Sequence, residues 1–177
     1  MVPIYGRVFC PRCGYFEDVL ILIAQWFQPS LNIQEEDIRR ALDQLAQRIQ
    51  RQAEEQGTRL TSSPPGGPTR RYPAVDEPPA LDIATCRGIL DAANAVLRLE
   101  GYAGAEDYYA PQNSFINRVL ETRRGIPITM SLLYSCVLAR LGVVCEPVNF
   151  PSHFLLRWLE HPQATTDQGK VLVEELI

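Results

Sequence analysis

The chain has 177 residues, of which 46% are hydrophobic and 21% are charged, a composition typical of globular domains and unlike that of disordered chains. At this length we expect one hydrophobic core with appendages and no second full domain. The net charge of −4 supplies no basic field to hold a phosphate backbone, which argues against nucleic-acid binding.

Membrane and export signals are not predicted. The most apolar run, Val19 to Ala24, has six residues, whereas a membrane-spanning helix needs about 20. Residues 1–13 contain no continuous apolar stretch and no small-residue cleavage site. Five cysteines, an odd number, argue against a disulfide framework and for reduced thiols. We therefore expect a protein of the cytosol or nucleus without a membrane partner.

Residues 16–55 are expected to form two helices. The first, Glu17 to Phe27, has apolar residues on every side and is stopped by Pro29, which predicts a buried helix. Asn32 and Glu35 have the spacing of a capping box for the second helix. Its apolar residues recur with helical periodicity, namely Ile38, Leu42, Leu45 and Ile49. The pair Glu35–Arg39, at i,i+4, is expected on a solvated face.

Residues 56–80 interrupt the helical pattern, because six prolines and three glycines fall between Gln56 and Ala80. Neither a helix nor a central strand tolerates this composition. We expect a flexible Pro/Gly-rich surface insertion. The alternative is a proline-rich ligand segment, since Pro65 and Pro68 have the PxxP spacing that binds aromatic grooves.

Three more helices are predicted after the insertion. The first covers residues 81–101, and the second begins at residues 113–114 and stops at residues 123–125, where two arginines and a glycine form its C-cap. The third begins with Pro127, whose missing N–H costs nothing there, and closes at Gly142. Because apolar residues surround this third helix almost completely, we predict that it is the central, most buried helix.

Beyond Gly142 the hydrophobic period changes to two. Val143 to Phe150 and His153 to Trp158 are predicted to be two strands joined by a tight turn, with Val171–Val173 as a third strand. The predicted fold class is therefore α+β. It is mainly helical, with the central helix packed against a small antiparallel sheet.

A metal site is not predicted, although Cys10 and Cys13 have the CxxC spacing of half a structural zinc site. The remaining cysteines are isolated, and no second CxxC or paired histidine supplies the missing ligands. Residues 1–15 are left as an unassigned segment, for which half a zinc site and an unpaired, splice-derived end are the alternatives. No cofactor is expected.

A thiol enzyme needs a cysteine at a helix N-terminus, a histidine on a neighbouring strand and an orienting Asp or Asn. His153 opens a predicted strand after the central helix, but Pro127 at the helix start has no nucleophilic atom. Cys136 lies nine residues further, about 13 Å along the axis, and is interpreted, like Cys145, as an inert buried thiol. His153 is then a structural hydrogen-bond partner, and His161 is exposed and idle.

Two stretches, Asp107 to Tyr134 (DYYAPQNSFINRVLETRRGIPITMSLLY) and Leu141 to Trp158 (LGVVCEPVNFPSHFLLRW), resemble the SirB-type transglutaminase-like family. The resemblance implies a transglutaminase-like, cysteine-protease-like core over residues 81–177, incomplete at its C-terminus. It places the family's nucleophilic cysteine at Pro127, its histidine at His153 and its aspartate at Glu174. These are then vestigial active-site positions, and the resemblance implies that the chain has no catalytic residue and is not an enzyme.

Within this family, Glu146 to Trp158 is most similar to the central region of F-box proteins, which are substrate-recognition subunits of cullin-type ubiquitin ligases. The resemblance implies a catalytically degenerate protein-binding module whose partner is a protein substrate of a ubiquitin ligase. We recognise no F-box and expect a fragment, a short isoform or an incomplete gene model. An active cysteine acyl transferase or protease of the same superfamily is the alternative, and the oligomeric state stays open.

Overall fold

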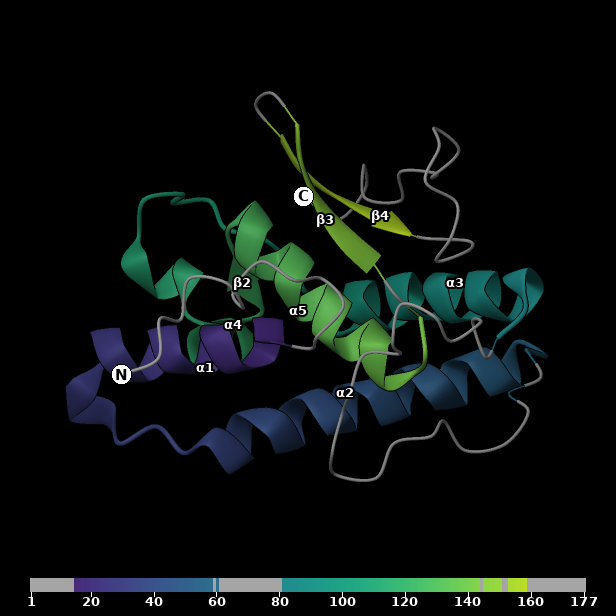
Figure 1. The fold of residues 1–177 in the computed structure, drawn as a ribbon, viewed down its shortest axis with the longest axis horizontal. Helices are drawn as coiled ribbons and strands as arrows, with labels where there is room; N and C mark the ends of the chain where they lie inside the picture. Colours follow the sequence, from purple (N-terminus) through teal and green to yellow (C-terminus); the bar gives the residue numbers. More distant parts are fainter. Residues whose placement is uncertain (1–14, 59, 61–80, 144, 151–152, 159–177) are drawn as a thin grey trace.

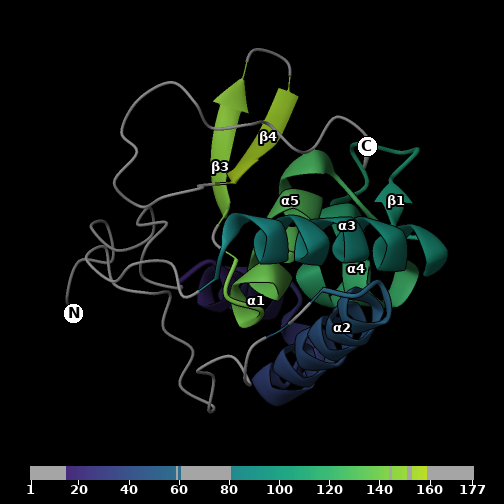
Figure 2. The ribbon, with the colours of Figure 1, turned by 90° about the vertical axis from the view of Figure 1, so that its right-hand side faces the viewer.

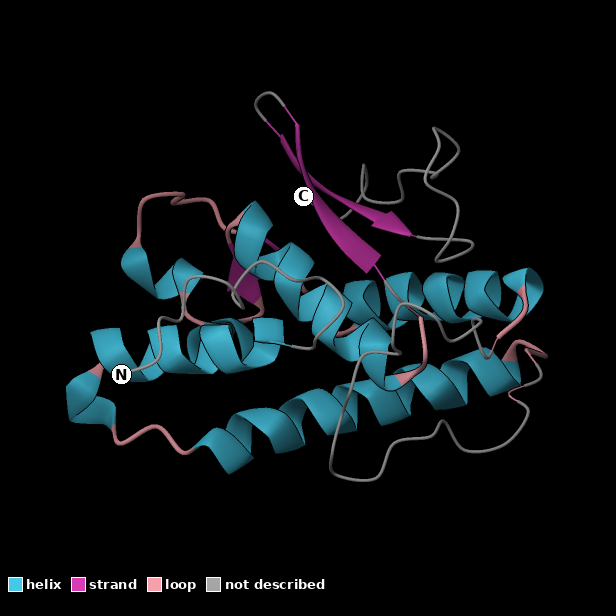
Figure 3. Cartoon of the chain, viewed as in Figure 1, coloured by secondary structure: helices cyan, strands magenta, loops and turns pink. Residues whose placement is uncertain are grey.

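A computed structural model describes residues 15–58, 60, 81–143, 145–150 and 153–158 of the chain. The helices are α1 (Tyr15–Phe27), α2 (Glu35–Glu55), α3 (Ile83–Leu99), α4 (Ile116–Thr122) and α5 (Pro127–Arg140). The strands are β1 (Ala103–Gly104), β2 (Arg124–Gly125), β3 (Cys145–Phe150) and β4 (His153–Trp158), and the short 3₁₀ helices are η2 (Pro29–Leu31) and η3 (Pro111–Ser114). The predicted α+β class is confirmed: helices form the body, and the β3–β4 hairpin projects from one side (Figure 3).

Helix α5 is the centre of the molecule, as its all-round apolar sequence predicts. Leu133, Val137 and Leu138 are at most 1% exposed, and α5 contacts the other four helices and both strands of the hairpin. The hairpin stands above α5 and α3, and α2 lies on the opposite side (Figures 1 and 2). Because α5 is covered from all these directions, its apolar residues form the shared core.

Both ends of α5 match the prediction. Pro127 is its first residue, where the missing N–H removes no helical hydrogen bond. At the other end Gly142 has a φ of +81°, which lets the backbone N–H of Val143 donate to the Leu138 carbonyl at 3.1 Å. This arrangement is a Schellman cap. It explains why β3 begins at Cys145 and not at Val143, which the sequence pattern had assigned to the strand.

Helices α2 and α3 run antiparallel and side by side, with α2 below α5 and α3 behind it (Figure 1). The four predicted core positions of α2 are all buried, namely Ile38, Leu42, Leu45 and Ile49. Asp82 caps α3, because its carboxylate accepts from the backbone N–H of Thr85 at 2.9 Å. A Cβ atom on Gly88 would lie 2.1 Å from the Thr58 hydroxyl, so α3 approaches the chain after α2 closely at this glycine.

Helix α1 departs from the prediction of a fully buried helix. Leu20, Ile21 and Ala24 are buried, but Leu22 and Trp26 are 55% and 81% exposed. The reason is that α1 packs against α4 and α5 on one side only. Apolar residues on every side of a helix usually indicate complete burial, so the opposite side of α1 is an exposed apolar surface.

Two predicted helix starts are also wrong, and in both cases a 3₁₀ turn is the cause. Helix α2 begins at Glu35 after Gln34, whose side chain makes no capping hydrogen bond, while Asn32 ends η2 with a φ of 24°. The predicted capping box is therefore not formed. Helix α4 begins at Ile116, because η3 occupies Pro111–Ser114 and Phe115 is the N-cap residue of α4.

The sequence pattern indicated that Gly125 stops α4, but the helix ends before this glycine. Arg123, with a φ of +60°, ends the helix, and Arg124 and Gly125 form β2, which pairs in parallel with β1. A Cβ atom on Gly125 would lie 3.1 Å from both Met130 and Val119. The glycine therefore allows β2 to pass close to α4 and α5. A two-residue strand is too short to produce a periodic pattern, so sequence analysis missed it.

The antiparallel hairpin is confirmed. Its register runs from Cys145 opposite Trp158 to Phe150 opposite His153, and Cys145, Leu156 and Trp158 are buried. The predicted third strand Val171–Val173 and residues 61–80 of the predicted insertion lie outside the described residues. Of the helices that the structure describes, none combines the length and apolar character that crossing a membrane requires.

Candidate functional site

The first turn of α5 is held in place by the segment that precedes α4. The backbone N–H of Ile126, the N-cap residue of α5, donates to the Asn113 carbonyl at 3.1 Å. The Asn113 side chain donates to the Asp107 carbonyl at 2.7 Å, and the Thr129 hydroxyl donates to the Ser114 carbonyl at 3.4 Å. These contacts connect the start of α5, the predicted site, to the loop between β1 and η3.

That loop, residues 105–110, contains Tyr108 and Tyr109, which belong to the stretch Asp107 to Tyr134 that resembles the transglutaminase-like family. Its first residue, Ala105, donates a backbone hydrogen bond to Gly125 at 3.0 Å, two residues before Pro127. Tyr108 and Tyr109 are 57% and 90% exposed and make an edge-to-face contact, with ring centroids 5.4 Å apart. We call these two side chains the tyrosine rim. Figure 1 shows the loop on the same side of the molecule as the start of α5.

Pro127, the predicted position of the nucleophile, is the first residue of α5 and is partly exposed. A helix N-terminus stabilises a thiolate through its dipole and its free N–H groups. The pyrrolidine ring offers no thiol, hydroxyl or carboxylate to that field. This partly exposed position at the helix start therefore carries no group able to attack a substrate.

The cysteines near α5 are buried, as the sequence predicts. Cys136 and Cys145 are each 2% exposed, and burial raises the pKa of each thiol from 9.0 to about 12. Burial also raises the pKa of the Cys86 thiol, to about 11. A thiol reacts as the thiolate, so all three groups are in their unreactive form at neutral pH.

The other predicted site residues are described only in part. His153 is the first residue of β4 and pairs with Phe150 at the turn end of the hairpin. Glu174, His161 and the pair Cys10 and Cys13 lie outside the described residues. Of the three positions that the resemblance predicts to be vestigial, the structure therefore describes Pro127 and the backbone of His153. Within the described ranges no cluster of three or more His, Cys, Asp or Glu side chains is arranged to hold a metal.

Buried polar groups along α5 are a feature that sequence analysis missed. The Tyr134 hydroxyl donates to the Asn94 side chain at 2.9 Å, and burial raises the Tyr134 pKa above its ordinary value. The hydroxyls of Ser131 and Ser135 are buried and have no hydrogen-bond partner among the residues that the structure describes. These groups lie along a helix that the sequence identified only as apolar.

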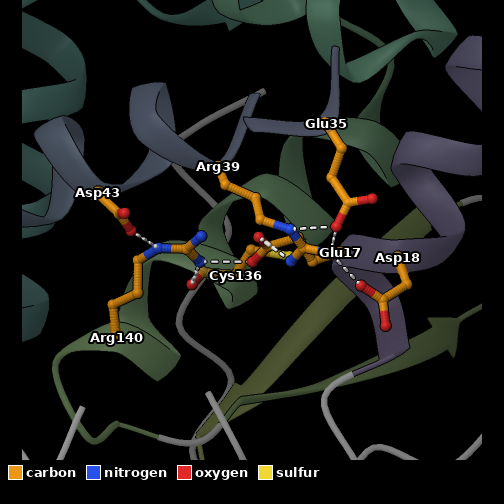
Figure 4. A network of polar contacts seen from close by, with 7 residues as sticks. All are labelled: Glu17, Asp18, Glu35, Arg39, Asp43, Cys136 and Arg140. Atoms are coloured by element: carbon orange, nitrogen blue, oxygen red, sulfur yellow. Dashed lines mark hydrogen bonds and ion pairs between the residues drawn. The ribbon is translucent and has the colours of Figure 1, made fainter. Parts of the chain in front are cut away.

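A charged network surrounds the C-terminal end of α5 and joins it to α1 and α2 (Figure 4). Arg140, with a side chain 7% exposed, pairs with Glu17 at 2.7 Å and with Asp43 at 2.8 Å. The same guanidinium donates to the Cys136 carbonyl at 2.7 Å. It thereby satisfies a backbone acceptor near the end of the helix and two carboxylates together.

Arg39 forms the second half of this network. It pairs with Glu17 at 2.7 Å and Asp18 at 2.6 Å, and its Nε donates to Glu35 at 2.7 Å. Burial alone lowers the pKa of Arg39, but hydrogen bonds to Asp18 and Glu35 outweigh this effect and raise the pKa above its ordinary value. The Glu35–Arg39 pair predicted for a solvated face is thus part of a partly buried network. Its other partners, Glu17 and Asp18, come from α1, so the i,i+4 spacing within α2 did not reveal them.

Comparison with known proteins supports a family for this chain. A family model described as the transglutaminase-like superfamily matches residues 36–174. F-box only protein 21 of Homo sapiens is 34% identical over 148 residues, which are 82% of this chain and 22% of that protein. The same protein of Mus musculus is 44% identical over 101 residues, 56% of this chain and 16% of the relative. The chain therefore spans less than a quarter of the F-box relatives that it matches.

Bacterial relatives match a shorter part of the chain. A UPF0162 protein of Xylella fastidiosa is 47% identical over 58 residues, which are 32% of this chain and 21% of the relative. No solved structure matches the chain.

Proposed function

This chain belongs to the transglutaminase-like superfamily, and we propose that it is a catalytically degenerate member that binds protein. In this proposal it serves as the substrate-recognition region of an F-box-type ubiquitin-ligase adaptor, and its partner is a protein substrate of the ligase. The observation that carries the proposal is Pro127 at the first position of α5. That position is where a thiol enzyme of this architecture needs its nucleophile.

The remaining thiols of the described residues do not replace the nucleophile. Cys136 lies nine residues along α5 from Pro127, about 13 Å at 1.5 Å per residue. Burial raises the pKa of its thiol to about 12, so the thiol stays protonated at pH 7. Covalent catalysis is activated by lowering a thiol pKa, whereas burial here raises it. The geometry therefore favours binding over chemistry.

The tyrosine rim supports binding of a protein partner beside the N-terminal end of α5. Tyrosine is enriched at protein interfaces because a large apolar ring carries a polar hydroxyl. Tyr108 and Tyr109 are exposed on a loop that is linked to the residues just before α5, through the hydrogen bond from Ala105 to Gly125 and through Asn113, so the scaffold positions them. The relatives named F-box only protein 21 favour a ubiquitin-ligase substrate as the bound protein.

Catalysis is tested with the purified chain, a fluorescent primary amine and a glutamine-containing protein such as casein. We expect no incorporation of the amine above the level measured in the absence of the chain, and the same result for Cys136→Ala. Turnover that disappears in Cys136→Ala or Cys145→Ala would instead establish the active cysteine enzyme.

Binding is tested by comparing the proteins captured from proteasome-inhibited cells by the wild-type chain and by a Tyr108→Ala/Tyr109→Ala variant. Ile83→Ala is the matched control, because Ile83 is 48% exposed at the far end of α3 from β1. We expect the double variant, and not the control, to lose ubiquitinated partners. An identical set for all three proteins would contradict the assignment of the tyrosine rim.

A further inference from the structure

We propose that the outward side of α1 is the interface of a homodimer, in which α1 packs against α1 of a second copy of this chain. This side, the α1 face, consists of Val19, Leu22, Ile23 and Trp26. The inference is independent of the substrate-recognition role, since it concerns association between copies and not the entrance of α5.

The α1 face lies directly opposite the buried side of the helix. The buried residues Glu17, Leu20, Ile21 and Ala24 follow the helical repeat, and the outward residues follow the same repeat on the other side. Leu22, Ile23 and Trp26 are 55%, 37% and 81% exposed. An ordinary surface helix has polar residues on this side. An apolar side left open on such a helix indicates a further packing partner.

The spacing of the α1 face indicates that the partner is a helix. Val19, Leu22 and Trp26 are separated by three and then four positions. Alternating steps of three and four place apolar residues along one seam, which is the pattern by which two helices interlock side chains. An irregular loop or a sheet edge does not require this repeat.

The charge pattern favours a second copy of the same chain. There is no Asp, Glu, Lys or Arg from Val19 to Gln34, although the whole chain has a net charge of −4. Across a two-fold axis each surface meets itself, so like charges on it would repel. The α1 face avoids this repulsion. The glutamines beside it are already paired, since Gln25 donates to the Ile33 carbonyl at 3.0 Å and Gln28 to Asn117 at 3.0 Å.

The α1 face, together with the adjoining Phe27 and Leu31, presents an apolar area that suits a small, weak dimer contact. Trp26 and Phe27, 81% and 69% exposed, together present roughly 300 Å² if each aromatic side chain has an area of about 150–250 Å². Leu22 and Leu31, about half exposed, extend the apolar surface to roughly 500 Å². Two such surfaces would bury about 1,000 Å² in total, which is the lower limit for a specific interface and less than the roughly 1,600 Å² of a standard one. Phe27 also stacks on Phe115, with centroids 6.4 Å apart, which continues the surface to the chain before α4.

Sedimentation equilibrium of the full chain between about 1 and 100 μM tests the proposal. The chain has a mass of 20.0 kDa, so the expected result is a concentration-dependent rise to twice that mass. Trp26→Glu places a charge from each copy in the apolar interface, where burial disfavours it, and is expected to leave a monomer. Leu99→Glu is the matched control, because Leu99 is 80% exposed on α3, and it is expected to dimerise like the wild type. A wild type that stays monomeric, or a dimer unaffected by Trp26→Glu, would overturn the proposal.

A cross-linking experiment keeps the test decisive if Trp26→Glu fails to fold. Leu22 is near the middle of α1, so in an antiparallel pair it meets the same residue of the other copy. Under mild oxidation we expect Leu22→Cys to give a disulfide-linked dimer, and neither the wild type nor Leu99→Cys to do so. Equal cross-linking of Leu22→Cys and Leu99→Cys would show random collision and would count against the interface.

Discussion

Replacing Arg140 by Met tests whether the charged network holds α1 and α2 onto the central helix. The substitution keeps an unbranched side chain of similar length and removes the ion pairs with Glu17 and Asp43 and the hydrogen bond to the Cys136 carbonyl. Four carboxylates surround the two arginines of the network. Without Arg140, Glu17 keeps its ion pair with Arg39, and Asp43 loses the ion pair that joins it to α5.

The expected loss of unfolding free energy is about 3 kcal/mol. Breaking a buried ion pair by removing one partner costs about 3–5 kcal/mol, because the other charge stays buried. Glu17 is 7% exposed but keeps Arg39 at 2.7 Å, which places its share at the lower end. Asp43, with a side chain 36% exposed, regains water at little cost. Losing one donor to a backbone carbonyl adds about 1 kcal/mol, and the buried Met stem offsets part of the total.

Urea denaturation followed by circular dichroism measures this loss. With a slope of about 2 kcal/mol per molar urea, the midpoint should fall by about 1.5 M. Arg40→Met is the matched control, because Arg40 and its partner Asp37 have side chains 65% and 66% exposed and such pairs contribute at most about 0.5 kcal/mol. The reasoning is refuted if Arg140→Met costs less than about 1 kcal/mol or no more than Arg40→Met. In a double-mutant cycle, Glu17→Gln combined with Arg140→Met should cost less than the sum of the single changes.

Three further predictions concern one buried thiol and two glycines. Because burial raises the Cys136 pKa from 9.0 to about 12, the stability that depends on its neutral thiol is complete below about pH 9 and is lost as the pH rises towards 12. Cys136→Ala should flatten the fall in melting temperature between pH 9 and 11, and rapid labelling of native Cys136 by a thiol reagent at pH 8 would disprove its burial. Gly142→Ala should cost about 1–2 kcal/mol of unfolding free energy, since φ is +81° and L-residues are strained there. A Cβ atom on Gly142 would also lie 3.2 Å from the Leu81 side chain. Gly101→Ala, at +82° with nothing near its Cβ, is the control that has the strain without such a contact, and unchanged denaturation midpoints for both variants would rule out the strain. Gly88→Ala should lower the denaturation midpoint despite a gain in helix propensity of about 1 kcal/mol, because the new Cβ would lie 2.1 Å from the Thr58 hydroxyl. Adding Thr58→Ala should restore most of the lost stability. If it restores none, this contact is not the cause of the loss.

The sequence by itself determined most of the local structure. Apolar residues at steps of three and four identified the buried side of α2, and all-round apolarity identified α5 as the central helix. Pro127 and Gly142 marked the two ends of α5. These features are local, because helix propensity, capping and periodicity depend on residues within about one turn of each other. The same locality explains why the amino-acid pattern alone singles out Pro127 at the candidate site.

Tertiary structure alone decided which surfaces those elements cover. Nothing within α1 states that only one of its apolar sides has a neighbour, since the neighbours are α4 and α5, about 90 or more residues away in the chain. Arg140 and Asp43 are 97 residues apart in sequence and 2.8 Å apart in space, and the tyrosine rim reaches the α5 entrance through a two-residue parallel strand pair. Such contacts depend on how distant parts of the chain pack around one core, and the sequence next to a residue does not determine that packing.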